Sequence, residues 1–291
     1  MEETLGRLLQ AVLSGLLLGG VYALAALGLS LIWGVMKVVN VAHGVIALLA
    51  SYLALTLYQR GLDPLISIAL IVPTFFVLGL VVERVFVHPV LRRPEMDSLL
   101  VLFGGTIALE NVIQRVWSAD FRTLNPWYSG TSVAVGGLNV SIARGLAFVL
   151  SLAAVFALSA LLTRTHLGRA IRATAQNRPT AMLAGIDVDR IALIAFGLGT
   201  ALAGVAGVAL ALIYSFYPTV HFFWIVKAFL VVVLGGVGNV RGTLAAALLL
   251  GVAEGLLGSL VSFAWVDVSV YVLLVLVLLL RPRGLYGFRT A

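Results

Sequence analysis

Residues 8–33 read LLQAVLSGLLLGGVYALAALGLSLIW, a run without a single charged side chain. A helix of about 20 apolar residues is long enough to cross the roughly 30 Å hydrocarbon layer of a bilayer. The run is too long for the apolar core of a cleavable signal, and Met1-Glu2-Glu3 before it is acidic where a signal peptide is basic. We therefore expect it to form the first membrane span.

The same pattern recurs along the chain. Further apolar stretches span residues 43–58, 64–87, 98–117, 143–163, 191–213, 223–237, 243–262 and 266–280. The chain is 62% hydrophobic and 11% charged, whereas a soluble domain has about a quarter of its residues charged. The stretches are continuously apolar, which favours helices over the alternating strands of a β-barrel. We predict an all-α polytopic membrane protein with a single transmembrane domain over 1–291, a bundle of about eight or nine helices, some short or broken.

Sidedness follows from the positions of the basic residues. The net charge is +7, and the basic residues gather in short connections between apolar stretches. This distribution is typical of loops that face an anionic lipid surface, so we expect the chain to contact a bilayer and not to bind nucleic acid. Cytoplasmic loops are rich in Lys and Arg, which places 84–97, 164–190 and the C-terminus in the cytoplasm of a multi-pass protein of the inner or plasma membrane. The residues concerned are Arg84, Arg92, Arg93, Arg164, Arg169, Arg172, Arg178, Arg190, Arg281, Arg283 and Arg289. Counting spans puts the N-terminus outside. If 43–58 instead turns back within the membrane, the N-terminus is cytoplasmic.

Region 118–142 is the longest polar excursion on the external side. It combines Thr, Val, Trp and Tyr residues with Gly136-Gly137, which predicts a small hairpin with these glycines in its turn. Two roles stay open for it, a docking surface for an external partner and an aromatic cap at the membrane interface.

The chain contains no recognisable energy-converting or catalytic motif. Its only lysines, Lys37 and Lys227, follow Met36 and Val226, so neither completes the phosphate-binding motif G-x-x-x-x-G-K-[ST]. The absence of cysteine excludes a thiolate metal site, and no nucleophile–base pair or H-E-x-x-H motif is present. We expect no catalytic residue, no metal and no cofactor on this chain, so that ATP and Mg²⁺, if they drive it, bind partner subunits.

Loop 164–190 offers a place for such partners to dock. Asn177 can cap a short helix, Pro179 fits its first turn and Gly185 can end it, while Asp189 can cap the next span. This helix would present apolar side chains across the membrane face, although a solvated connector is the alternative. We assign the coupling surface to Arg172, Gln176, Asn177, Pro179, Met182, Leu183 and Gly185.

Two segments interrupt the apolar pattern, 34–44 (GVMKVVNVAHG) and 235–242 (GGVGNVRG). Glycine-interrupted segments in the two halves of a transporter point to broken helices that line the pathway. A tight cytoplasmic turn explains 235–242 equally well. The similarity between the segments is too loose to indicate a repeat.

Polar residues inside the spans are candidates for the pathway. An ionised Glu254 in the middle of 243–262 costs on the order of 2–3 kcal/mol, so we expect it to face the bundle interior or a wet cavity. Glu110, Asn111 and Gln114 are expected on one side of 98–117. His43 is either a proton relay or bonded to backbone. The pathway candidates are Asn40, His43, Gly44, Thr106, Glu110, Asn111, Asn239 and Glu254.

Four blocks of the sequence resemble one family. VNVAHG (39–44), FGGTIALEN (103–111), ATAQNRPTAMLAGIDVDR (173–190) and GGVGNVRGTLAAALLLGVAE (235–254) look like motifs of the branched-chain amino acid ABC transporter permeases. The resemblance runs from about Gly15 to Tyr286 and is to the first of the two permease types. The chain departs from the family pattern at Val45, where an acidic residue is frequent, and at Arg241, where proline is common.

The resemblance implies an importer permease for branched-chain or other hydrophobic amino acids. It would work with two cytoplasmic ABC ATPase subunits, a second related permease or another copy of itself, and an external solute-binding protein. Urea and short-chain amide permeases are similar, so these solutes stay open. A stand-alone ion-coupled carrier that uses Glu254 and His43 is the alternative from a different class.

Overall fold

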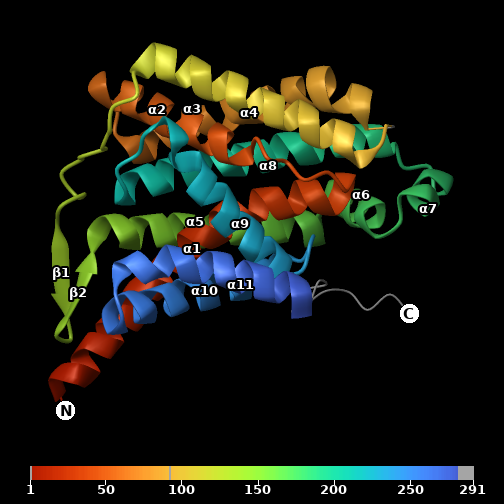
Figure 1. The fold of residues 1–291 in the computed structure, drawn as a ribbon. Helices are drawn as coiled ribbons and strands as arrows, with labels where there is room; N and C mark the ends of the chain where they lie inside the picture. The colour runs from red at the N-terminus through yellow and green to blue at the C-terminus, as the bar shows by residue number, and fades with distance from the viewer. Residues whose placement is uncertain (1, 92, 281–291) are drawn as a thin grey trace.

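Most helices lie roughly along one direction, with a β-hairpin at one end of the bundle and two short helices at the other (Figure 1). This computed structural model describes residues 2–91 and 93–280. Arg92 and the tail residues Arg281, Arg283 and Arg289, which contribute to the predicted sidedness, lie outside the described residues. The elements are α1 (Glu2–Met36), α2 (His43–Gln59), α3 (Pro64–Val82), η1 (Glu83–Val87), η2 (His88–Val90), α4 (Glu95–Trp117), β1 (Ser132–Val135), β2 (Leu138–Ser141), α5 (Ile142–Arg164), α6 (His166–Gln176), α7 (Arg178–Leu183), α8 (Val188–Ile213), η3 (Pro218–Val220), α9 (His221–Gly235), α10 (Val240–Leu260) and α11 (Phe263–Leu280).

Each apolar stretch predicted from the sequence forms a helix, so the all-α prediction is confirmed. Within the described residues, seven helical segments are long and apolar enough to cross a membrane, and α2 and α11 are shorter apolar helices. We call the end that holds β1 and β2 the hairpin end, and the opposite end the α7 end. The α1 helix begins at the hairpin end, where Gln10 Nε2 donates to the carbonyl of Asn139 at 2.8 Å. The N-terminus therefore lies on the same side as region 118–142, as the span count predicts.

The α1 helix forms the centre of the bundle and contacts α5, α8, α9 and α10. Gly15 and Gly19 face Gly251 and Ala247 of α10, with no side chain between the two backbones. A Cβ atom at Gly19 would lie 2.7 Å from the carbonyl oxygen of Ala247, closer than real Cβ contacts allow. The small-xxx-small pattern of Gly15 and Gly19 thus marks a close helix crossing.

The short helix α2 begins inside the bundle. After Met36 the chain turns back, and His43 in the first turn of α2 lies with Nε2 3.0 Å from the carbonyl oxygen of Ala25. Ala25 precedes the end of α1 by eleven residues, about 16 Å of helix. Segment 34–44 is therefore a break within the bundle, and His43 is bonded to backbone, one of the two readings that the sequence left open.

Segment 235–242 is instead a tight turn between α9 and α10. Gly236 and Gly238 have φ values of 86° and 77°, which only glycine adopts freely. The turn packs against the end of α1, because Gly34 lies against Gly238 and the Gly238 N–H donates to Ser30 Oγ at 3.0 Å. The two interruptions seen in the sequence thus meet at the α7 end.

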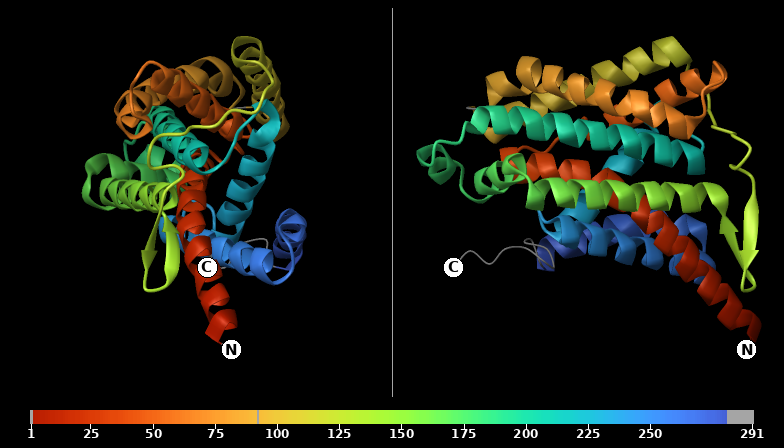
Figure 2. Two further views of the ribbon diagram at one scale, coloured as in Figure 1. Left: turned by 90° about the vertical axis from the view of Figure 1, so that its left-hand side faces the viewer. Right: turned by 180° about the vertical axis from the view of Figure 1, so that it is seen from behind.

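The α9 helix crosses the bundle obliquely. Seen from the hairpin end (Figure 2, left), α2, α3 and α4 lie on one side and α10 and α11 on the other, with α9 between them. Its first residue, His221, contacts Gly44 of α2, and its last, Gly235, contacts Gly242 at the start of α10. Its side chains therefore reach both groups of helices.

The predicted hairpin is confirmed. Strands β1 and β2 pair antiparallel from Ser132↔Ser141 to Val135↔Leu138, and Gly136 and Gly137 take positive φ values of 59° and 84° in the turn. Beside the hairpin, Tyr128 donates to Asp63 Oδ1 at 3.1 Å. Burial and this neighbouring carboxylate raise the pKa of the Tyr128 hydroxyl.

The crossing of α2 and α8 supplies a stability prediction. A Cβ atom at Gly207 would collide with the carbonyl of Ala47, and the Gly207 carbonyl already accepts a hydrogen bond from Ser51 Oγ at 2.8 Å. Gly207→Val is expected to destabilise the bundle by about 1–3 kcal/mol or more. The measurement is the unfolding temperature of the detergent-purified protein, with Gly104→Val as control because nothing lies within 4 Å of that position. Equal unfolding temperatures for the two variants would contradict the close crossing.

Candidate functional site

Loop 164–190 folds into two short helices where the sequence predicted one. Thr165 caps α6 by accepting the Gly168 N–H at 2.9 Å, and Asn177 caps α7 by accepting the Thr180 N–H at 3.1 Å. Pro179 occupies the first turn of α7, as predicted. After α7, Gly185 has a φ of 80° and its N–H donates to the Met182 carbonyl at 3.0 Å, a glycine-terminated helix end.

The α7 helix presents apolar side chains to the outside of the bundle. Met182 is 58% exposed and Leu183 is 91% exposed. Arg172 and Gln176 are exposed on the preceding α6. Met182 and Leu183 thus form an exposed apolar tip on a helix whose two ends are both capped.

An ion pair joins α7 to the span that follows. Arg178 Nη2 lies 2.6 Å from Asp189 Oδ1 in the first turn of α8. The prediction that Asp189 caps α8 is wrong, because Asp187 occupies that position and accepts the Arg190 N–H at 3.0 Å. A depression of about 510 Å³ next to this pair is lined by His88, Leu91, Arg178, Met182, Val188 and Asp189. Lys37 donates to the Ala175 carbonyl at 3.3 Å, so the end of α1 is bonded to α6 as well.

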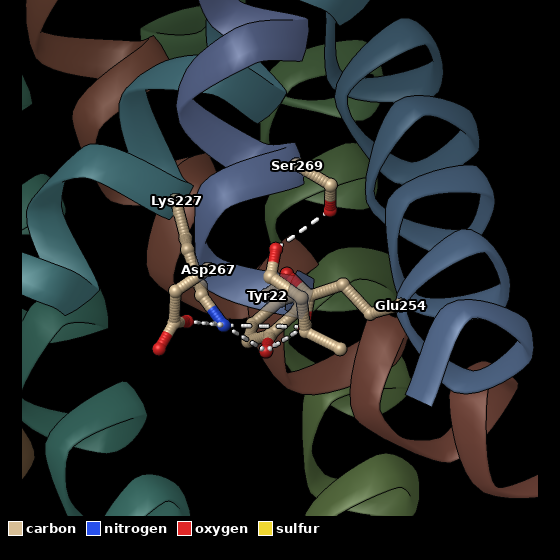
Figure 3. A network of polar contacts seen from close by, with 6 residues as sticks. Tyr22, Lys227, Glu254, Asp267 and Ser269 are labelled. Carbon is tan, nitrogen blue, oxygen red and sulfur yellow. Dashed lines mark hydrogen bonds and ion pairs between the residues drawn. The ribbon is translucent and has the colours of Figure 1, made fainter. Parts of the chain in front are cut away.

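The second polar region lies within the bundle, around Glu254. This side chain is 5% exposed, and its Oε2 accepts from the Tyr22 hydroxyl at 2.7 Å. Lys227 Nζ lies 3.2 Å from the same oxygen, 3.1 Å from the Tyr22 hydroxyl and 3.6 Å from Asp267 Oδ1 (Figure 3). Four helices, α1, α9, α10 and α11, therefore contribute to one charged network.

Sequence reasoning identified Glu254 but missed Lys227, Tyr22 and Asp267. The signal for Lys227 was its place in the apolar stretch 223–237, because a cation there needs a carboxylate partner. The prediction that Glu254 faces the bundle interior or a wet cavity agrees with its position.

A cavity of about 750 Å³ extends from this network to the hairpin end. Lys227, Glu254 and Tyr214 lie at its inner part, while Gln10 of α1 and Asn139 of β2 line it at the hairpin end. At the α7 end the same helices are in direct backbone contact through Gly34 and Gly238. The cavity thus opens on the hairpin side of the network.

A second contact with a carboxylate is made by the start of α9. His221 Nε2 lies 3.0 Å from Glu110 Oε2, and Gln114 donates to Glu110 Oε1 at 3.2 Å. Asn111 lies on the same side of α4 by helical spacing, but it is exposed and its Nδ2 donates to the Ile107 carbonyl at 2.7 Å, so it takes no part in the contact with His221. Sequence reasoning did not identify His221. The α9 helix is thus joined to a carboxylate of α4 by its first residue, His221, and to a carboxylate of α10 by Lys227 in its middle.

The remaining pathway candidates are scattered. Asn40 is fully buried, and neither polar atom of its side chain has a hydrogen-bond partner among the described residues; the same holds for His43 Nδ1. Gly44 lies against the His221 carbonyl. Thr106 bonds to the Leu102 carbonyl of its own helix at 2.8 Å, and Asn239 caps α10 by accepting the Gly242 N–H at 3.0 Å. The structure therefore does not gather the predicted pathway residues into one site.

Comparison with known proteins adds a family relationship. Residues 11–279 match the family model described as "Branched-chain amino acid transport system / permease component". The chain is 33% identical over 293 residues to the high-affinity branched-chain amino acid transport system permease protein BraD of Pseudomonas aeruginosa, covering 96% of this chain and 95% of BraD. It is 32% identical over 304 residues to LivH of Escherichia coli K12, a protein of the same description, covering 99% and 98%. LivM of the same organism matches over 142 residues at 32% identity, covering 48% and 33%. No solved structure matches the chain.

Proposed function

Since this chain belongs to the family of permease components of branched-chain amino acid transport systems, we propose that it is the membrane-spanning permease of an ATP-binding cassette importer for branched-chain or other hydrophobic amino acids. ATP and Mg²⁺ bind ATPase subunits on the cytoplasmic side, and this chain supplies the path through the membrane. Its partners are two such ATPases, a second related permease or another copy of itself, and an external solute-binding protein.

The observation that carries the coupling role is the geometry of α7. This helix has a side-chain cap at Asn177 and a glycine end at Gly185, and it exposes Leu183 almost completely. A rigid helix with an apolar tip fits a socket on a partner protein. Its ion pair with Asp189 and the neighbouring contact of Lys37 with α6 connect it to α8 and α1, so a push on α7 reaches the centre of the bundle.

The charge distribution supports a cytoplasmic position for α7. Basic side chains at the α7 end are Lys37, Arg84, Arg93, Arg164, Arg169, Arg172, Arg178, Arg190 and Arg241, whereas the hairpin end carries Arg7, Arg60, Arg115, Arg122 and Arg144. Cytoplasmic faces attract the larger share of Lys and Arg. In this orientation the cavity opens outward, towards the solute-binding protein.

Reconstituted uptake tests the function. The complex that co-purifies with a tagged copy of this chain from its native cells would be placed in vesicles and supplied with ATP and labelled solutes. We expect ATP-dependent uptake of leucine, isoleucine or valine. Uptake of urea or acetamide in preference to these amino acids would contradict the substrate class, and leucine uptake by the isolated chain without ATP would contradict the importer assignment.

The Arg178–Asp189 pair supplies a prediction for coupling. Arg178→Asp alone is expected to lower uptake per ATP hydrolysed several-fold, because it places two carboxylates together at the α7–α8 junction. The charge-reversed double variant Arg178→Asp/Asp189→Arg is expected to recover much of this ratio. Both side chains are partly exposed, so the pair has little effect on stability. Failure of the double variant to recover coupling, with normal folding, would contradict transmission through this pair.

A further inference from the structure

The cavity on the hairpin side of the charged network is lined by both a carboxylate, Glu254, and an ammonium group, Lys227. We propose that it holds the transported amino acid as a zwitterion within the membrane, with the substrate ammonium on Glu254 and the substrate carboxylate on Lys227. The inference rests on the proposed function only for the identity of the solute.

Glu254 offers an unoccupied acceptor. Its Oε2 receives the Tyr22 hydroxyl and the Lys227 ammonium, but its Oε1 is buried and has no partner among the described residues. A buried carboxylate oxygen without a donor is costly, particularly in a low-dielectric bundle. A primary ammonium brings three N–H donors and a positive charge, so it satisfies this oxygen better than any neutral solute does.

Lys227 offers the complementary charge. Its side chain is 16% exposed and lines the cavity, and its contact with Asp267 at 3.6 Å is the longest of its three. A substrate carboxylate can take over that position at shorter range without breaking the contacts with Glu254 and Tyr22. Arg144 lines the same cavity and makes no ion pair within the described part of the chain, which adds positive potential for a carboxylate.

The rest of the lining suits a branched aliphatic side chain. Ala11, Gly15, Leu18, Gly255 and Val266 line the cavity next to the charged network. Gly15 and Gly255 pack against the backbone of the opposing helix at the α1–α10 crossing, so this part of the wall is closely packed. A volume of about 750 Å³ lies within the range of roughly 300–1,000 Å³ that small-molecule sites occupy.

The site also lies within the bundle, some distance from the α7 end. Glu254 is fourteen residues from Val240 at the α7 end of α10, a helical rise of about 21 Å. A solute held there has entered from the hairpin side but has not passed the packing of Gly34 against Gly238. Such a position fits an outward-open stage of the transport cycle.

Photocrosslinking of the whole complex tests the proposal. Leucine that carries a diazirine in its side chain would be irradiated with the reconstituted complex without ATP, and the labelled peptides identified by mass spectrometry. We expect labels within 11–18 and 255–259. Leucine should compete at least tenfold better than leucinamide, which lacks the carboxylate, or 4-methylpentanoate, which lacks the ammonium. Labels elsewhere, or equal competition by the three compounds, would overturn the proposal.

A matched pair of variants separates the site from general effects of burial. Glu254→Gln keeps the side-chain volume and is expected to reduce labelling at least tenfold, whereas Glu83→Gln removes another fully buried carboxylate, paired with His88, and should leave labelling unchanged. The wild-type competition series stands even if Glu254→Gln folds poorly. ATP-driven leucine uptake without cavity labelling overturns this inference alone. Cavity labelling without ATP-driven uptake supports the site and overturns the proposed function.

Discussion

Leu183→Asp is expected to abolish ATP-driven uptake while the bundle remains folded. Leu183 is 91% exposed, so its replacement removes no internal packing. If α7 inserts this side chain into an apolar socket on the ATPase, the new carboxylate must be buried without a partner, which costs several kcal/mol of docking free energy. The measurements are the amount of ATPase subunit that co-purifies and the initial rate of leucine uptake, and we expect both to fall at least tenfold.

His166→Asp is the matched control for this variant. His166 is also exposed at the α7 end, and the substitution also introduces one negative charge, but at the start of α6, where a helix N-terminus tolerates an acidic residue. Uptake should stay close to the wild-type rate. Equal losses for the two variants would mean that charge at this end matters and that the apolar tip of α7 does not.

Lys227→Met is expected to have the largest effect on folding. Removing the cation leaves Glu254, 5% exposed, without its charged partner, and loss of one member of a buried pair costs about 3–5 kcal/mol. The double variant Lys227→Met/Glu254→Gln removes both charges and keeps an acceptor for the Tyr22 hydroxyl. It should regain most of the stability and none of the leucine labelling. The unfolding temperatures of the two singles and the double variant give the coupling energy of the pair.

The other lysine of the chain provides the control. Lys37 is exposed at the α7 end, where its ammonium group donates to the Ala175 carbonyl at 3.3 Å and makes no ion pair within the described residues. Lys37→Met should change the unfolding temperature little. If Lys227→Met lowers the unfolding temperature no more than Lys37→Met does, the Lys227–Glu254 ion pair does not stabilise the bundle.

The helices and their ends were readable from the sequence because lipid leaves the backbone few choices. Each apolar run forms a helix, and Asn177, Gly185 and Gly136-Gly137 act as a cap, a helix end and a hairpin turn, as predicted. These features depend on local chemistry. Asp189 was misassigned because Asp187 precedes the same apolar run, and helix starts are uncertain by one or two residues.

The arrangement of the polar interior was not readable in the same way. Lys227 needed a carboxylate, but Glu110, Glu254 and Asp267 all lie on apolar helices, and the oblique path of α9 decides among them. Likewise, hydropathy shows that 43–58 is short but not that α2 starts beside Ala25. Both facts depend on packing between segments distant in sequence.

The most direct test of the account is the side of the membrane on which α7 lies. The chain has no cysteine, so Leu183→Cys and Trp127→Cys each introduce a single thiol at an exposed position, one on α7 and one in region 118–142. A membrane-impermeant maleimide applied to intact cells should label the Trp127→Cys variant and spare the Leu183→Cys variant until the membrane is permeabilised. Labelling of the Leu183→Cys variant from outside intact cells would contradict a cytoplasmic ATPase docking on α7.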